Sequence, residues 1–246
     1  AGSGSIELDL SGLTSAGFLN AKLKVSDGVD SSSDEFNTWF ISNKSTVTIT
    51  QDDDPSDGAS EGSSSEKDYY VYDLIGSTAS TAGTKWLIVA DSLADEDDLS
   101  SFREVLLKSI NALNESDASA FFAGYFDIVV VEPVTFDGSS PAAIKTGCYD
   151  WGETVYCIGS SDIDTSVFND FLPGNDLISV LTMIDGRGVN LGNTNIQPIG
   201  DRTEFTLMHE LGHAHGEMGD EYLEKHGRDV ANYSDRNVNT TTQSDP

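Results

Sequence analysis

Two histidines and a glutamate between His209 and His213 (HELGH) have types and a spacing suited to metal-assisted hydrolysis. On a helix, residues four apart lie on the same face, so His209 and His213 can bind one metal ion from one side. Glu210 can then reach a water molecule on that metal. The pattern predicts a catalytic zinc ion, with the two histidines as ligands and Glu210 as the base. The alternative is that these histidines pack in the core.

The flanking residues predict the helix that must carry this pattern. Asp201 and, three residues later, Glu204 resemble a capping box with Asp in place of Ser or Thr. Phe205 and Met208 recur at helical steps beside the histidines. Gly216 is suited to the end of the helix, because glycine accepts the left-handed conformation that is common there.

A third zinc ligand is expected after this helix, because a catalytic zinc ion usually has three protein ligands and one position for water. Gly216 and Gly219 provide flexible backbone for a chain reversal, and two acids follow. Asp220 is our first choice of ligand and Glu221 our second. The alternative is that Asp220 caps a following helix and Glu221 is solvated. His215 lies two residues past the second histidine, where a helix would point it away from the metal.

The segment from His209 to Tyr222 (HELGHAHGEMGDEY) resembles the IgA-peptidase-type family of bacterial secreted zinc metallopeptidases, whose signature is HExGH followed by DEY. The family is metzincin-like, and Gly216 matches the metzincin glycine. Gly219 stands where a strict metzincin has its third ligand, and the acid follows at Asp220. The resemblance implies zinc-dependent endopeptidase action on proteins, without the immunoglobulin specificity of the name. Tyr222 would either support the transition state or pack.

The resemblance extends from Tyr70 to Pro246. Lys85–Asp91 and Phe126–Pro133 look like the first two strands of the family, and Cys148 to Cys157 looks like a cysteine-bearing loop. In zinc peptidases of this general build, the strand before the motif helix lies along the cleft, and an extended substrate can pair with its edge. By analogy, we assign this role to Ile184–Asn193.

Cys148 and Cys157 are the only cysteines, and they lie in the short segment GCYDWGETVYC. A disulfide between them would close a small loop and stabilise the fold by ~2–3 kcal/mol. Because the chain has the features of a secreted protein, we predict this disulfide. Two free thiols or metal ligands are the alternatives.

From Tyr69 onward, strand and helix patterns alternate. The apolar runs Trp86–Ala90, Phe126–Val131 and Ser179–Ile184 are expected of strands covered on both faces. Ser101 and Glu104 form a capping-box pattern between the first two runs. A helical stripe accompanies it: Phe102, Val105, Leu106, Ile110 and Leu113. The order predicts an α/β fold, which the resemblance specifies as a zincin- or metzincin-like domain with a mixed sheet and an active-site helix.

We expect three parts along the chain. Residues 1–50 predict a small all-β fragment of an immunoglobulin-like or cadherin-like sandwich, with strands at Ser5–Leu10, Phe18–Val25 and Thr46–Thr50. Residues 51–67 are acidic and rich in Ser and Gly, which is typical of a linker. Residues 68–246 form the zinc metallopeptidase domain. The opening AGSGS looks like part of a longer precursor. No methionine follows Met218, so a metzincin-type Met-turn would either lie beyond Pro246, in a peptidase domain truncated at its C-terminus, or be absent.

The net charge is −29, with 42 acidic and 13 basic residues, which disfavours binding to nucleic-acid phosphates or to anionic membrane surfaces. No segment approaches the roughly 18 consecutive apolar residues of a membrane-spanning helix. The family resemblance implies a secreted or surface-attached bacterial protein whose partner is a protein or peptide substrate, and this composition suits such a protein. The acidic run is a candidate calcium site, since calcium prefers several oxygen ligands, with a solvated face as the alternative. Its members are Asp91, Asp95, Glu96, Asp97 and Asp98.

A rival function is that of an inactive binding or structural module in a larger bacterial surface protein. The acidic linker and the β-rich start of the chain would suit that function. The intact Glu210 argues against it, because a purely structural zinc site needs no general base. We therefore predict a zinc metalloendopeptidase.

Overall fold

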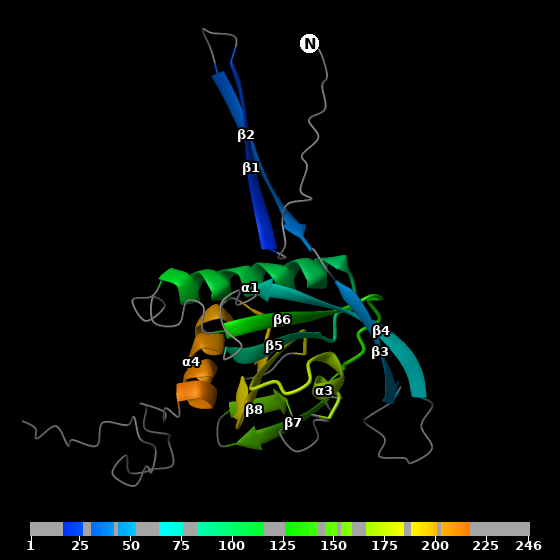
Figure 1. Ribbon diagram of the computed structural model, residues 1–246. Helices are drawn as coiled ribbons and strands as arrows, with labels where there is room; N and C mark the ends of the chain where they lie inside the picture. The colour runs from blue at the N-terminus through cyan, green and yellow to red at the C-terminus, as the bar shows by residue number, and fades with distance from the viewer. Residues whose placement is uncertain are drawn as a thin grey trace, which may run out of the picture.

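A seven-stranded mixed sheet forms the centre of the molecule in the computed structural model (Figure 1). The structure describes residues 17–26, 31–41, 44–52, 64–75, 83–115, 126–141, 146–151, 154–158, 166–184, 188–200 and 203–216. The strands are β1 Gly17–Ser26, β2 Ser31–Phe40, β3 Ser45–Asp52, β4 Ser64–Ile75, β5 Thr84–Asp91, β6 Phe126–Pro133, β7 Thr146–Trp151, β8 Thr154–Ile158, β9 Leu177–Thr182, β10 Val189–Leu191 and β11 Thr194–Pro198. The helices are α1 Glu96–Glu115, α3 Phe168–Phe171 and α4 Thr203–Gly216.

The strand order in the large sheet is β10-β11-β9-β5-β6-β4-β3. The four strands β11, β9, β5 and β6 are parallel to one another, whereas β10, β4 and β3 pair antiparallel with their neighbours. Parallel strands of this kind are covered on both faces, and every residue of β9 is buried. The predicted α/β class with a mixed sheet is therefore confirmed. Predicted Ser179–Ile184 corresponds to β9, which begins and ends two residues earlier.

Two apolar layers form on the two faces of the sheet, because successive side chains of a strand point to opposite sides. On β5, Trp86 and Ile88 belong to the first layer, while Leu87 and Val89 belong to the second. The first layer includes the buried apolar residues of α1 and α4. Figure 1 shows the positions of these two helices. The second includes Phe168 and Phe171 of α3, so helices cover both faces.

Helix α1 begins at Glu96, with Asp95 as its cap, so the predicted capping box at Ser101 is wrong. Asp95 Oδ1 accepts hydrogen bonds from the backbone N–H groups of Asp97 and Asp98, each at 2.9 Å. In return, Asp98 Oδ2 accepts one from Ala94 N at 2.8 Å. The arrangement resembles a capping box, except that Asp98 binds the N–H group of Ala94, the residue before the cap, instead of that of Asp95. The acidic first turn also suits the positive end of the helix. Four residues of the predicted stripe are buried as expected: Phe102, Val105, Leu106 and Ile110.

The first strands form two different arrangements. β1 and β2 make a two-stranded antiparallel hairpin, which points away from the sheet in Figure 1. β3 instead pairs with β4 at one edge of the large sheet. The boundary predicted at residue 50 therefore falls inside β3, and the ends of the predicted linker belong to β3 and β4. The immunoglobulin-like fragment stays a prediction, and Ser5–Leu10 lies outside the described residues.

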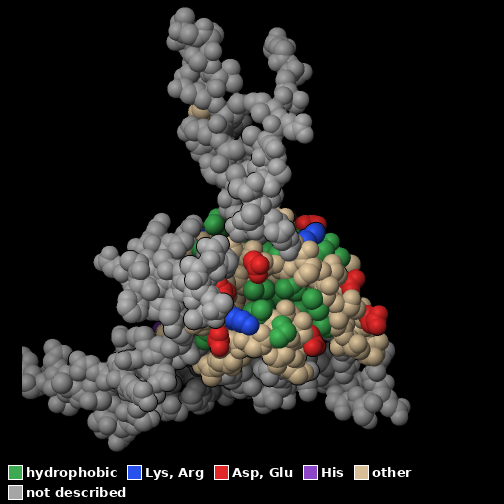
Figure 2. All heavy atoms as spheres, in the orientation of Figure 1, with side chains coloured by type: hydrophobic (Ala, Val, Ile, Leu, Met, Phe, Trp, Pro, Cys, Tyr) green, Lys and Arg blue, Asp and Glu red, His purple; other side chains and the backbone are tan. Residues whose placement is uncertain are grey.

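None of the helices in the described part of the chain is long and apolar enough to cross a membrane. On the face drawn in Figure 2, acidic side chains lie around a hydrophobic area, with basic side chains at a few places.

Candidate functional site

Helix α4 carries the HELGH segment and is joined tightly to the end of β11. Thr203, its first residue, is buried. Thr203 Oγ1 accepts a hydrogen bond from Gly200 N at 2.7 Å and lies 2.9 Å from Pro198 O. The described helix extends to Gly216, the residue at which the sequence predicts its end. The predicted cap, Asp201, lies outside the described residues.

The inner face of α4 is defined by Leu207 and Leu211, which are 0 % and 6 % exposed and belong to the same apolar layer as α1. Position 209 is two residues past Leu207, so it lies about 200° around the helix from that buried position. His209 is accordingly exposed, and Glu210 is half-buried. A core-packing role for His209 is therefore excluded. Position 213 lies one turn further along the same helix, although the side chain of His213 is outside the described set.

The edge strand β10 lies beside this part of α4. It pairs antiparallel with β11 and is the last described strand at its end of the sheet. Asn190 Nδ2 lies 3.5 Å from the backbone oxygen of Glu210, to which it donates a long hydrogen bond. The segment Ile184–Asn193, predicted to provide a strand edge, thus includes the edge strand, and its role in substrate binding stays a prediction.

Several predicted site residues cannot be placed. Asp220, Glu221 and Tyr222 lie outside the described residues.

Cys148 and Cys157 lie on β7 and β8, one position beyond the Tyr149–Tyr156 pair of that antiparallel hairpin. Since nothing is described of their side chains, the disulfide stays a prediction.

Within the described ranges, no three His, Cys, Asp or Glu side chains come together as a metal-binding group. These ranges include two of the proposed ligand positions, 209 and 213, which share one helix. The chemistry of the donors is suitable, because imidazole nitrogens are common zinc ligands. The exposed His209 on the outer face of α4 fits such a role.

The acids considered for calcium have other partners. Asp91 is 0 % exposed, and its carboxylate accepts hydrogen bonds from the hydroxyls of Ser92, Ser140 and Thr182 at 2.8, 2.5 and 2.7 Å. Ser92 has a φ of 59°, which is rare for a residue other than glycine. Asp95 and its capping partner bind the backbone at the start of α1, as described above. Calcium binding stays a prediction, and these contacts give Asp91, Asp95 and Asp98 partners within the protein.

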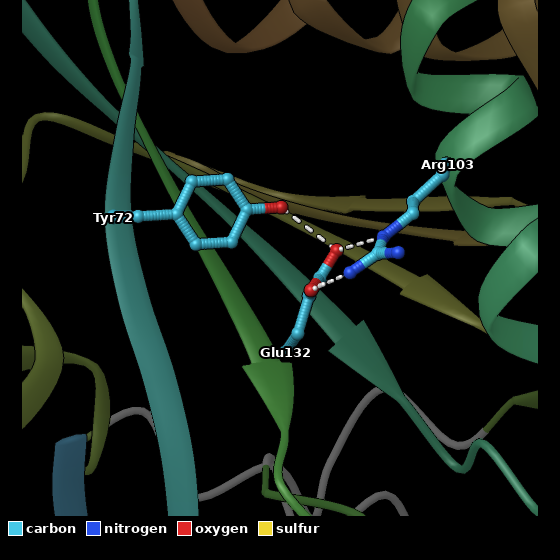
Figure 3. A network of polar contacts seen from close by, with 3 residues as sticks. All are labelled: Tyr72, Arg103 and Glu132. Atoms are coloured by element: carbon cyan, nitrogen blue, oxygen red, sulfur yellow. Dashed lines mark hydrogen bonds and ion pairs between the residues drawn. The ribbon is translucent and has the colours of Figure 1, made fainter. Parts of the chain in front are cut away.

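A buried ion pair, which the sequence did not suggest, joins α1 to the sheet (Figure 3). Glu132 of β6 is 1 % exposed and accepts hydrogen bonds from Tyr72 Oη and from Arg103 Nε and Nη2, at 2.7, 2.8 and 2.7 Å. Burial alone would lower the pKa of Arg103. The hydrogen bonds and the negative charge of Glu132 outweigh burial and raise the pKa of Arg103 above its usual value. Both oxygens of Glu132 therefore have partners.

A second polar group that the sequence did not suggest lies on β11. Asn195 and Gln197 are each 1 % exposed, although they are polar and sit on a strand next to the edge. Within the described part of the chain, three of their side-chain atoms have no hydrogen-bond partner: Asn195 Oδ1, Gln197 Oε1 and Gln197 Nε2. Alternating polar residues on an outer strand normally indicate a solvent-facing side, so the sequence contains no signal for their burial.

No family model matches the chain, and no curated protein matches it.

Proposed function

We propose that the chain is a secreted or surface-attached zinc-dependent endopeptidase of the IgA-peptidase type. The observation that carries this proposal is the placement of the HELGH segment on α4. Leu207 and Leu211 bind one face of the helix to the core, while His209 is exposed on the other. Position 213 lies on the same outer side as position 209, one turn away, so two imidazoles could share one ion.

His209 and His213 would hold the zinc ion, with Asp220 as the third ligand and Glu221 as the second choice for that position. When bound, zinc would polarise the substrate carbonyl and lower the pKa of water toward ~7. Two imidazoles and one carboxylate would leave a position free for this water.

Glu210 would accept a proton from the attacking water and then donate it to the leaving amine. Its side chain is half-buried, at the boundary between the core and the outer face of α4. The hydrogen bond from Asn190 reaches the backbone of the same residue, so the edge strand and the proposed base are linked. Tyr222 could add a hydrogen bond to the transition state.

The position of β10 suggests how a peptide would bind. Because β10 is the edge strand next to α4, an extended peptide that paired with its backbone would run past the outer face of the helix. Main-chain hydrogen bonds of this kind do not depend on side-chain type. They therefore support a protein or peptide substrate, with specificity determined elsewhere.

Metal content and proteolysis, measured together, test the proposal. The full chain should contain one zinc ion per molecule by elemental analysis and should cleave an unfolded protein such as casein. A chelator should abolish cleavage, and added zinc should restore it. Stoichiometric zinc without cleavage would support the inactive binding module instead. Failure to take up zinc would refute the ligand assignment.

The third ligand is tested with a matched pair of substitutions. Asp220→Asn should weaken zinc binding in a competition with a chelator, because a neutral amide is a poor zinc ligand. Glu221→Gln, the adjacent control, should change zinc affinity much less. If Glu221→Gln is the more damaging change, Glu221 is the ligand.

A further inference from the structure

The buried amides of Asn195 and Gln197 lie between the β10–β11 pair and α4. Both side chains point to the face opposite Ile196, which packs in the second apolar layer, because neighbours along a strand alternate. Asn190 is the direct cross-strand partner of Asn195 and therefore shares its face. The contact from Asn190 to Glu210 O shows that this is the face that α4 covers.

The hydrogen bonding of these amides is incomplete. Asn195 Oδ1 and both polar atoms of the Gln197 amide are buried and have no partner among the residues that the structure describes. An exchange of the oxygen and nitrogen positions of Gln197 would not help, since both atoms are unpartnered. Buried polar groups are nearly always hydrogen-bonded in folded proteins, to protein or to ordered water.

The Gln197 amide lies close to Gly188, the residue just before the adjoining strand β10. A Cβ atom added at Gly188 would lie 2.5 Å from Gln197 Oε1 and 2.6 Å from Nε2. Position 188 therefore has to be glycine for the amide to occupy this space. The side chain fills a defined site instead of reaching out toward solvent.

We propose that Asn195 and Gln197 form a binding site for ordered water beneath α4. The ligand must accept a hydrogen bond from Gln197 Nε2 and donate to Gln197 Oε1 and Asn195 Oδ1. Water can do both, whereas a cation can bind only the oxygens and an anion only the N–H group. Buried waters typically make about three hydrogen bonds to such groups. The hydrated amides would be present whether or not the chain is a peptidase.

The sign of a change in melting temperature tests this site. In the full chain, Gln197→Met keeps a similar side-chain length but removes both polar atoms. If water bridges the amides, the variant removes the hydrogen bonds between Gln197 and this water, which then binds Asn195 alone. Tm should therefore fall by about 2–6 °C. If the amides are dry, the same change removes two unsatisfied polar atoms, and Tm should rise. Ser179→Ala, which removes the partner of Trp86 Nε1, is the control for loss of one buried hydrogen bond.

Two further measurements test the position of the Gln197 amide and the presence of the water. Gly188→Ala should also lower Tm, and the double variant Gly188→Ala, Gln197→Ala should recover part of that loss. A high-resolution crystal structure should show solvent density about 2.7–3.2 Å from Gln197 Nε2 and Oε1. A rise in Tm for Gln197→Met, no effect of Gly188→Ala, or a metal-length contact to the oxygens would each overturn the proposal.

Discussion

Helices α1 and α4 cover the same face of one sheet, yet their polar contacts to the sheet differ. Beneath α1, the carboxylate of Glu132 binds Arg103 and Tyr72, and both of its oxygens are satisfied. Beneath α4, three buried atoms of the Asn195 and Gln197 amides have no partner in the described ranges. Beneath α1 the polar contacts join the helix to the sheet, whereas beneath α4 the protein leaves its polar atoms incompletely paired.

The comparison suggests that the two helices have different roles. A buried ion pair with all its hydrogen bonds fixes the position of α1. Removing one partner of this pair should lower the free energy of unfolding strongly. Helix α4 has two buried leucines on its inner side and the exposed His209 on its outer side. We therefore expect substitutions at α1 to change stability, and substitutions on the outer face of α4 to change activity.

The largest effect is expected on the outer face of α4. Glu210→Gln should lower kcat for casein cleavage by ~10²–10⁴-fold, because the variant lacks the carboxylate proposed to accept the proton of the attacking water. Zinc content and Tm should stay near those of the parent chain. Activity assays with elemental analysis on the same samples check this. Full activity in Glu210→Gln would show that another group is the base.

The next largest effect is expected beneath α1. Glu132→Gln should lower the free energy of unfolding by about 2–4 kcal/mol, somewhat less than for a fully buried pair, because the Arg103 side chain is 24 % exposed. Urea unfolding measures this loss. Glu104→Gln removes a solvent-exposed pair with Lys108 on the same helix and should cost only about 0.3–0.5 kcal/mol. Equal losses for the two variants would contradict the structural role of Glu132.

A smaller effect is expected at the start of α1. Asp95→Ala removes the acceptor for two backbone N–H groups and should cost about 1 kcal/mol of unfolding free energy. Ser101→Ala is the control, since the structure places Ser101 within the helix. If Ser101→Ala proved the more destabilising change, α1 would begin where the sequence pattern first suggested.

The smallest effect concerns the contact between Lys67 and Asp137. Burial alone would raise the pKa of Asp137, but hydrogen bonds from Lys67 and Ser139 outweigh it and lower the pKa. A carboxyl with a lowered pKa stabilises the fold above its unfolded-state pKa of about 4, and this contribution disappears as the pH falls through the folded-state pKa.

Asp137→Asn should therefore lower stability slightly at pH 7, by ~0–1 kcal/mol for such a surface pair, and should have no effect in strong acid. Tm measured against pH for the two proteins checks this. An unchanged difference between them at all pH values would contradict the assigned cause.

Local patterns in the sequence predicted the central strands and the helix stripe well. The apolar run Phe126–Val131 lies within β6, which begins at the same residue and ends two residues later, because a continuous apolar run identifies a strand covered on both faces. The start of α1 was misplaced because Asp95–Asp98 and Ser101–Glu104 both have capping-box spacing, and only the packed structure distinguishes them. β2 was not predicted, since its serine-rich start has weak strand propensity.

The polar contacts could not be predicted from the sequence, for a different reason. Arg103 and Glu132 are 29 positions apart, and their pairing depends on the crossover from β5 through α1 to β6. Asn195 and Gln197 look like solvent-facing residues until α4 is folded over them. At the site, the spacing of the HELGH segment indicated the shared helix face, and the structure adds the exposure of His209 and the neighbouring edge strand.

The length of β10 has a consequence for the protein at high concentration. A sheet edge exposes backbone groups that can pair with another chain, and long flat edges promote aggregation. β10 is three residues long, so this edge offers only about 10 Å of strand. Two copies that met edge to edge here could form few intermolecular hydrogen bonds. A short edge of this kind would favour brief contacts with extended peptides over the growth of a continuous sheet between molecules.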